Sequence, residues 1–159
     1  MIIYHSYRHS IIDFFEGKNG FSFHSKNIEE KSLSFATQNN RWANGIKNVK
    51  SIHLENIKFQ NENIFYQKPF IQFFDKKIAL LDDTFQFRKG VKIRVNFIII
   101  QNTPPFNIED IQQNFFFEKI IFDTSNSQWK VKNWKQDCQK LNIQYYDIFE
   151  QGAFEVVLE

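Results

Sequence analysis

Apolar and polar residues alternate along the first 25 positions, and this period of two predicts β-strands. We expect strands over residues 2–6, 11–17 and 21–25. Residues 16–20 read EGKNG, a sequence rich in turn formers, so the strands on either side of it should form a hairpin.

The pattern becomes helical over residues 27–40, where Asn27 is the expected N-cap and Glu29 and Glu30 lie in the first turn. Short β-type runs then return, and Pro69 predicts that one of them is an edge strand or is broken. The strands expected in this middle region are 51–59, 63–74 and 77–83.

Strands and helices alternate at short spacing in the last third. Pro104 and Pro105 exclude a helix until Asn107 caps one. The apolar face of that helix contains Ile108, Ile111 and Phe115. A second helix over residues 127–141 has Val131, Trp134, Cys138 and Leu141 on one face, with Lys132, Lys135 and Gln139 on the other. The expected strands are 93–100, 119–124, 143–148 and 153–158.

This order of elements predicts one α/β domain over residues 1–159. Strands joined through helices by short links form a parallel sheet with right-handed crossovers. We therefore expect a mixed sheet with an antiparallel N-terminal half and a βαβαβ C-terminal half.

The composition is that of a globular chain, with 42% hydrophobic and 24% charged residues. Aromatic residues reach 18%, mostly from 20 Phe. We attribute the excess of Phe, Asn, Ile and Lys to compositional bias, because these residues are spread along the whole chain. A net charge of +2 permits contact with nucleic acid but falls short of a basic-patch signature.

A single cysteine, Cys138, excludes an internal disulfide and a zinc site built from several thiolates. Its place on an apolar helix face predicts a buried, inert thiol. The longest purely apolar run, residues 97–100, is too short to span a membrane, and the N-terminus lacks the pattern of a signal peptide. We expect a soluble chain that can be a piece of a larger protein.

The histidines do not form a metal motif in the sequence. The alternation around His5 and His9 favours extended backbone, which would place their rings roughly 13 Å apart, too far to share an ion. His24 and His53 stand alone in their segments, and no histidine-rich, phosphate-loop or nucleophile motif occurs. The acidic pairs at 82–83 and 109–110 are typical of turns and helix starts. We expect no catalytic residue, no metal ligand and no cofactor.

Residues 123–127, DTSNS, stand where a predicted strand ends and a helix begins. This is a position where α/β proteins hold ligands, and it is also where a helix requires an N-cap. Capping accounts for one or two of these residues, and four in a row favour a ligand-facing loop. Trp129 and the lysines that follow form either an aromatic and cationic surface for single-stranded nucleic acid or a solvated helix face with its tryptophans in the core.

Two blocks of the sequence resemble a known family. They are HSIIDFFEGKNGFSF at residues 9–23 and KIIFDTSNSQWKVKNWKQDCQKLNIQYYDIFEQGAFEV at residues 119–156. Both are similar to the soluble C-terminal region of ComEC-type DNA-uptake channels, in the form found in Bacteroidetes. The order of KIALLDD, RVNFIII and a late GAF is also similar.

The resemblance implies a domain of a membrane protein that passes single-stranded DNA inward during natural transformation. Many members carry a C-terminal domain of metallo-β-lactamase type, in which histidine- and aspartate-rich motifs after the strands hold metal. Here the loop after RVNFIII reads QNTPPFN, and Asp123 is the one candidate ligand of the loop at 123–127. The resemblance therefore implies a degenerate metallo-β-lactamase-like domain that is associated with the cytoplasmic membrane and lacks the nuclease ligands.

From this resemblance we expect a non-catalytic domain whose partners are single-stranded DNA and the membrane channel portion of a ComEC-like protein. Either Ser125 or Asn126 should cap the helix, whose free N–H groups would then face phosphate. The expected nucleic-acid-binding residues are Asp123, Ser125, Asn126, Trp129 and Lys130. One alternative is a metal-dependent nuclease with the carboxylate ligands Asp13, Asp82, Asp83 and Asp123. The other is an α/β interaction module without a nucleic-acid role.

Overall fold

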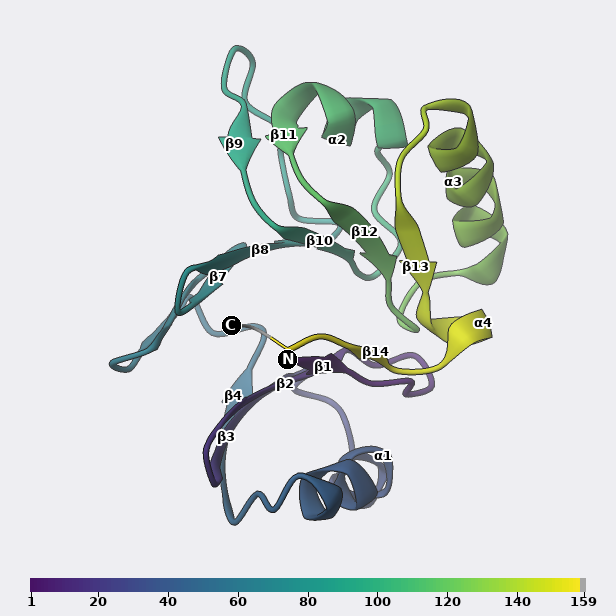
Figure 1. Ribbon diagram of the computed structural model, residues 1–159. Coiled ribbons are helices and arrows are strands. Elements are labelled where there is room, and N and C mark those ends of the chain that lie inside the picture. Colours follow the sequence, from purple (N-terminus) through teal and green to yellow (C-terminus); the bar gives the residue numbers. More distant parts are fainter. Residues whose placement is uncertain (158–159) are drawn as a thin grey trace.

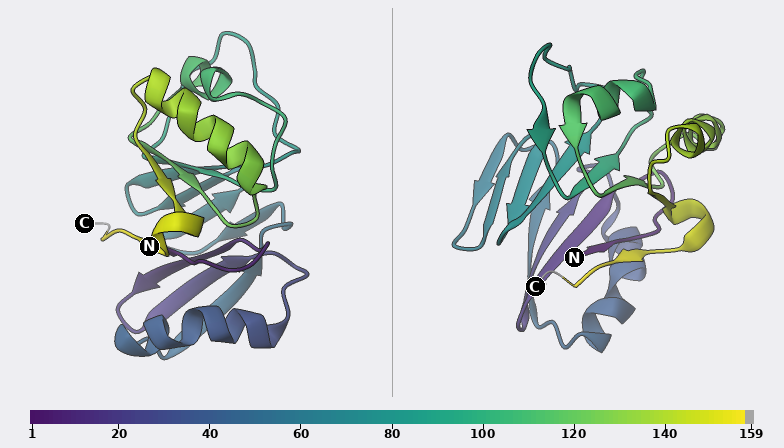
Figure 2. Two further views of the ribbon diagram at one scale, coloured as in Figure 1. Left: turned by 90° about the vertical axis from the view of Figure 1, so that its right-hand side faces the viewer. Right: turned by 45° about the horizontal axis from the view of Figure 1, so that its top comes forward.

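The computed structural model describes residues 1–157, which form two stacked β-sheets with helices on the outer face of each (Figure 1). Helix α1 (Glu30–Ala43) covers one sheet, whereas α2 (Ile108–Asn114) and α3 (Gln128–Lys140) cover the other. The views in Figure 2 show the same layers from two further directions. The predicted α/β class with mixed sheets is confirmed, and the architecture fits a lactamase-like fold.

The first sheet has the strand order β14-β1-β2-β3-β4. Its strands are β1 (Ile2–Ile3), β2 (Ile11–Glu16), β3 (Asn19–His24), β4 (Asn48–His53) and β14 (Phe154–Glu155). Strands β2 and β3 form the predicted hairpin, but β3 pairs with β4 in parallel because α1 connects them. The N-terminal half is therefore not wholly antiparallel. The strand predicted at 2–6 ends at Ile3, and residues 4–10 form a loop in which Arg8 has a positive φ of 59°.

The second sheet has the order β13-β12-β10-β8-β7-β6-β5. Its strands are β5 (Lys58–Gln60), β6 (Ile64–Gln67), β7 (Phe70–Phe73), β8 (Lys76–Leu81), β10 (Phe97–Ile100), β12 (Lys119–Phe122) and β13 (Tyr145–Asp147). Strands β8, β10, β12 and β13 are parallel, which confirms the βαβαβ unit that runs through α2 and α3. The predicted strand 63–74 is broken at Pro69 into β6 and β7. Strands β9 (Ile93–Arg94) and β11 (Phe115–Phe116) form a separate two-stranded sheet.

Further boundaries differ from the sequence-based expectation. The predicted strand 93–100 is divided between β9 and β10, which belong to different sheets. Helix α1 begins at Glu30 with Glu29 as N-cap, so Asn27 is not the cap. The predicted strand 51–59 is divided between β4 and β5, which belong to different sheets. The predicted strand 143–148 contains the shorter β13 and is followed by helix α4 (Ile148–Gln151), after which β14 crosses to the first sheet and pairs with β1. Position 158 of the last predicted strand lies outside the described residues.

Apolar side chains fill the spaces between the layers. The central core lies between the two sheets, where strand residues such as Phe14, Phe23 and Ile99 are completely buried. A second core lies under α2 and α3, where the predicted stripe of Val131, Trp134 and Cys138 is buried. Burial raises the pKa of the Cys138 thiol to about 12, which agrees with the inert thiol expected there.

Lys135 does not lie on the solvated face that the helical pattern predicted for it. Its Nζ is 3.0 Å from Asp147 Oδ2 and 2.6 Å from Glu150 Oε2. Burial alone would lower the pKa of Lys135, but its hydrogen bonds to Glu150 and Asp147 raise it. This lysine therefore ties α3 to the end of β13.

Candidate nucleic-acid interface

The parallel strands of the second sheet end along one edge, because Leu81, Ile100 and Phe122 are neighbours in register. The residues directly after these three strands are Asp82, Gln101 and Asp123. The predicted ligand-facing loop at 123–127 therefore lies beside the loop that follows β10. We call this row of strand ends and loops the strand-end edge.

Asp123 lies inside the protein, with 1% of its surface exposed. Its carboxylate accepts hydrogen bonds from Ser10 Oγ and from the backbone N–H of Ser125 at 3.0 Å. Burial raises the pKa of Asp123 to about 6, although the hydrogen bonds from Ser10, Ser125 and Gln101 oppose this rise. A carboxylate enclosed in this way has no surface left for DNA, so its contribution to the edge is structural.

Asn126 and Ser125 join the loop at 123–127 to the loop after β10. Asn126 Nδ2 donates to the carbonyl of Ile100 at 2.6 Å, and Asn126 Oδ1 accepts from the N–H of Thr103 at 2.9 Å. Ser125 Oγ accepts from the N–H of Asn102 at 2.9 Å. Asn102 and Thr103 both have positive φ values, of 56° and 51°, which cost energy for residues other than glycine. These cross-loop hydrogen bonds hold that backbone in place.

Neither Ser125 nor Asn126 caps α3, contrary to the prediction. The N-cap is Ser127, whose side chain makes no capping hydrogen bond. Its backbone N–H instead donates to Thr103 Oγ1 at 2.8 Å. Ser125, Asn126 and Ser127 therefore join this loop to the loop after β10.

The loop at residues 4–10 closes the edge from the side of the first sheet. Thr124 Oγ1 accepts from the N–H of Ser6 at 3.1 Å and donates to the carbonyl of Ser6. Ser10 reaches Asp123 from the end of the same loop. The strand-end edge is therefore built from both sheets.

Of the five predicted nucleic-acid-binding residues, Trp129 is the one whose aromatic ring is open to solvent, at 72% exposed. It lies in the first turn of α3, whereas Trp134 of the same helix is in the core. Lys130 is half-buried, and its Nζ lies 5.6 Å from the centre of the Trp134 ring. The loop at 4–10 adds an exposed Tyr7, over which the guanidinium of Arg8 lies at 5.0 Å. These side chains offer flat aromatic faces and positive charge.

The four carboxylates of the nuclease alternative each have a different environment. Asp13 is bound by Arg41 Nε at 2.8 Å on the side of α1. Asp82 is bound by Lys68 at 2.8 Å; burial would raise its pKa, but the hydrogen bonds from Lys68 and Thr84 lower it. Asp83 is exposed. Across residues 1–157, no three His, Cys, Asp or Glu side chains gather in a group that could hold a metal ion.

Two histidines that stand apart in the sequence are neighbours in the structure. His24 and His53 are paired in the register of β3 and β4, with ring centres 5.1 Å apart. Sequence reasoning missed this pair because it did not predict that these two strands are adjacent. His5 and His9, which we expected in a strand, lie in the loop at 4–10.

Sequence reasoning also missed residues 85–94, FQFRKGVKIR, which contain four cations and no acid. The signal was present in the sequence as a local charge run, but the even spread of Phe and Lys along the chain concealed it. In the structure this segment forms one wall of an aromatic pocket.

A family model described as the ComEC C-terminal domain matches residues 1–158. The chain belongs to this family. No curated protein and no solved structure matches the chain. Membership supports a role in competence DNA uptake, and ComEC proteins are membrane-associated. None of the helices within residues 1–157 is long and apolar enough to cross a membrane.

Membership in the ComEC C-terminal domain family confirms the resemblance on which the functional expectation rests. It also implies DNA and the ComEC membrane channel as the context in which the domain works.

Proposed function

We propose that this chain is a non-catalytic domain of a ComEC-like DNA internalisation channel and that it contacts single-stranded DNA at the strand-end edge. Trp129 is the observation that carries the proposal, because its ring is 72% exposed in the first turn of α3, directly after the loop at 123–127, and is open to a stacked base. Bases stack on exposed aromatic rings regardless of sequence, and cations such as Lys130 in α3 and Arg8 in the loop at 4–10 attract the phosphates.

The enclosed network of the edge supports the non-catalytic part of the proposal. In metallo-β-lactamase-type relatives, metal ligands follow the sheet strands; here Asp123 and Asn126 bind neighbouring loops instead. Under this proposal the chain is a soluble, degenerate metallo-β-lactamase-like domain that is associated with the cytoplasmic membrane. Asp123, Ser125 and Asn126 stabilise the loops of the edge. Trp129 and Lys130 contact the single-stranded DNA.

The binding part is tested by comparing two exposed tryptophans. Trp129→Ala removes the ring at the strand-end edge, whereas Trp42→Ala removes a ring that is 68% exposed on α1, on the opposite side of the molecule (Figure 1). We expect Trp129→Ala to weaken binding of a labelled single-stranded oligonucleotide about tenfold, since one stacked base contributes about 1–3 kcal/mol. Trp42→Ala should change the Kd, measured by fluorescence anisotropy at low salt, by less than about twofold. Equal effects of the two variants would contradict the proposal.

The non-catalytic part is tested by incubating the purified chain with labelled single-stranded DNA and Mn²⁺ at low salt. We expect the DNA to stay intact. Cleavage by the wild type that is lost in Asp123→Ala would instead support the carboxylate nuclease. Failure of the wild type to retard the DNA in a gel at low salt, where phosphate contacts are strongest, would favour an interaction module without a nucleic-acid role.

A further inference from the structure

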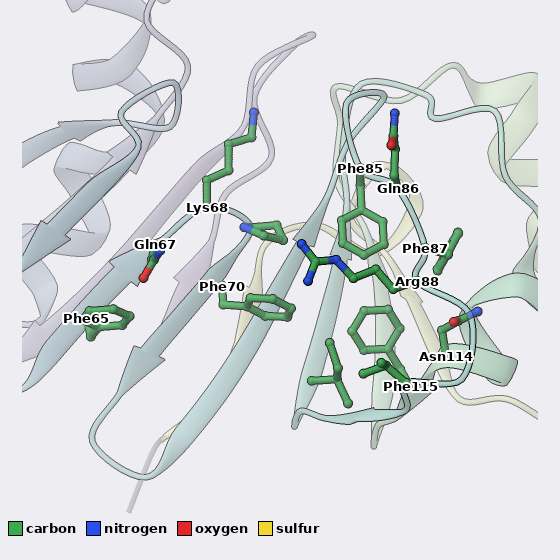
Figure 3. Close-up of a pocket in the computed structure, with 13 residues that line it drawn as sticks. Phe65, Gln67, Lys68, Phe70, Phe85, Gln86, Phe87, Arg88, Asn114 and Phe115 are labelled. Atoms are coloured by element: carbon green, nitrogen blue, oxygen red, sulfur yellow. The ribbon is translucent and has the colours of Figure 1, made fainter.

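An aromatic pocket of about 480 Å³ opens on the outer face of the second sheet, away from α3. Strands β6 and β7 form one side of it, and the segment Phe85–Ile93 and the end of α2 form the other (Figure 3). Its volume lies in the range of pockets that bind small molecules or single groups of a larger ligand. We call it the Phe pocket.

Five phenylalanine rings line the Phe pocket. Phe65 and Phe70 come from β6 and β7, Phe85 and Phe87 from the loop after β8, and Phe115 from the end of α2. Phe85 and Phe87 meet edge to face with ring centres 5.1 Å apart. Except for Phe115, these rings are only partly buried, so apolar faces are open toward the pocket. Flat faces of this kind suit a planar aromatic ligand.

The charged residues that line the Phe pocket are all positive. Its lining contains Lys68 and Arg88 and no acidic residue. Lys68 is already engaged by Asp82 at 2.8 Å, but Arg88 forms no salt bridge with any residue of the described chain. Figure 3 shows the Arg88 side chain extending from the loop toward the β7 side of the pocket. The pocket thus offers a free guanidinium beside open aromatic rings.

The adjoining chain extends this positive charge. Lys89, Lys92 and Arg94 follow Arg88, all are exposed, and no Asp or Glu interrupts the run from Phe85 to Arg94. The whole chain has a net charge of only +2, so this segment of ten residues holds a marked local excess. A ligand that fits this surface carries negative charge outside the pocket and an apolar, planar group inside it.

Amide groups supply hydrogen-bonding capacity at the rim. Gln67, Gln86 and Asn114 line the pocket. Asn114 Nδ2 donates a hydrogen bond to the carbonyl of Asp110 at 2.7 Å, and its Oδ1 remains as an acceptor. Such amides can meet the polar edges of a heterocycle, which a lipid chain or an apolar peptide side chain lacks.

We propose that the Phe pocket holds one unstacked base of single-stranded DNA, whose flanking phosphates are met by Arg88 and Lys89. The aromatic rings can stack on the face of the base, and the amides can form hydrogen bonds with its polar edge. The cations can bind the phosphates of the backbone. The inference rests on the proposed function, because it takes single-stranded DNA as the ligand, and it adds a second contact beyond Trp129.

The first test measures the affinity of the purified chain for a labelled oligothymidylate of about 15 nucleotides, a length within the site sizes of single-strand binders. Two variants act on the pocket without emptying it: Phe87→Leu removes a ring but keeps apolar volume, and Arg88→Gln removes charge but keeps an amide. Lys47→Gln, at an exposed lysine beyond the end of α1, is the matched loss of charge. We expect each pocket variant to weaken binding about tenfold and Lys47→Gln less than twofold. Equal effects of Arg88→Gln and Lys47→Gln would overturn the proposal.

The second test locates the base directly. A 5-iodouracil placed in the same oligonucleotide is photo-crosslinked to the wild-type chain, which is then digested with trypsin. A crosslink on the pocket peptide of residues 78–88 supports the proposal, whereas one confined to residues 120–130, which contain Trp129, overturns it but leaves the proposed function standing. Absence of any DNA binding by the wild type would overturn both.

Anionic vesicles provide the remaining comparison, because cations beside apolar rings also suit a lipid surface. Sedimentation with phosphatidylserine vesicles should be the same for the wild type and Phe87→Leu. If vesicle binding depends on Phe87 and oligonucleotide binding does not, the Phe pocket binds a membrane surface rather than a base. This result would overturn the proposal.

Discussion

The loop after β12 and the loop after β8 both leave the carboxyl end of a parallel strand, yet they present opposite surfaces. Residues 123–127 are small and polar, and they form hydrogen bonds with neighbouring loops as well as with one another. Residues 85–94 are aromatic and cationic, and their rings and charges border an open pocket. Hydrogen-bonding side chains at a strand end therefore indicate a ligand only where adjacent loops have not already used them. At this edge the neighbouring loop uses most of that capacity.

The largest expected effect concerns the stability of the polar loop. Asn126→Ala removes the side-chain hydrogen bonds to the carbonyls of Ile100 and Asp123 and to the N–H of Thr103, so we expect the free energy of unfolding to fall by about 4 kcal/mol. Asn56→Ala, at an exposed asparagine, should change it by less than about 0.5 kcal/mol. Urea unfolding measures both.

The same variant tests the division of roles between the two loops. At a temperature where Asn126→Ala is still folded, its affinity for single-stranded DNA should match that of the wild type. Loss of DNA binding with unchanged stability would show that Asn126 contacts the DNA directly. The loop at 123–127 would then bind the ligand rather than only its neighbouring loops.

A smaller effect is expected in the pH dependence of stability. The pKa of Asp123 is raised from 3.8 to about 6 in the folded state, so the folded chain holds a proton that the unfolded chain releases between these values. The contribution of Asp123 is fully present below pH 3.8 and is lost as the pH rises through about 6, a change of about 3 kcal/mol.

Asp123→Asn should remove this pH-dependent loss, because an amide does not titrate. The difference in unfolding free energy between wild type and variant, measured in urea from pH 4 to pH 7, should therefore grow in favour of the variant. Asp83→Asn, at an exposed neighbouring carboxylate, serves as the control. A constant difference across this range would show that Asp123 is not enclosed as described.

The smallest effect is expected in the salt dependence of DNA binding by the cationic loop. The double variant Arg88→Gln/Lys89→Gln removes two phosphate contacts, so the slope of log K against log salt should become shallower by about 1.4. Lys18→Gln/Lys47→Gln loses the same charge from exposed positions in the turn between β2 and β3 and after α1, and should leave the slope almost unchanged. Equal slopes for the two double variants would show that the cationic loop contacts no more phosphates than other exposed lysines do.

Local chemistry made several features of the fold predictable. Pro104 and Pro105 delay α2, and Asn107 and Asp110 form a capping box at its start. The apolar stripe of α3 was predictable because a period of 3.6 residues places Val131, Trp134 and Cys138 on one face. In these cases the physical cause lies within a few residues of its effect.

The candidate site was less predictable, because burial depends on residues distant in the sequence. Asp123 is enclosed by Ser10, which is 113 positions away, and no local pattern relates the two. Trp129 and Trp134 lie on the same helix, yet one is exposed and the other buried, as their different positions around the helix axis require. Sequence reasoning singled out the loop at 123–127 as ligand-facing, but it did not predict that Asp123, Ser125 and Asn126 form hydrogen bonds with neighbouring loops.

The sequence by itself determined the family, the α/β class and the order of the parallel strands with their helices, because motif, period and turn chemistry are local properties. Only the tertiary structure decided that the last strand returns to pair with the first, so that the N-terminal amine of Met1 donates to the carbonyl of Val156 at 2.8 Å. It also decided which polar groups are consumed inside the protein and which cations are left free around the Phe pocket. The reason is physical: a polar side chain can bind a ligand only through the hydrogen-bonding groups and charge that its neighbours in the fold have left unpaired.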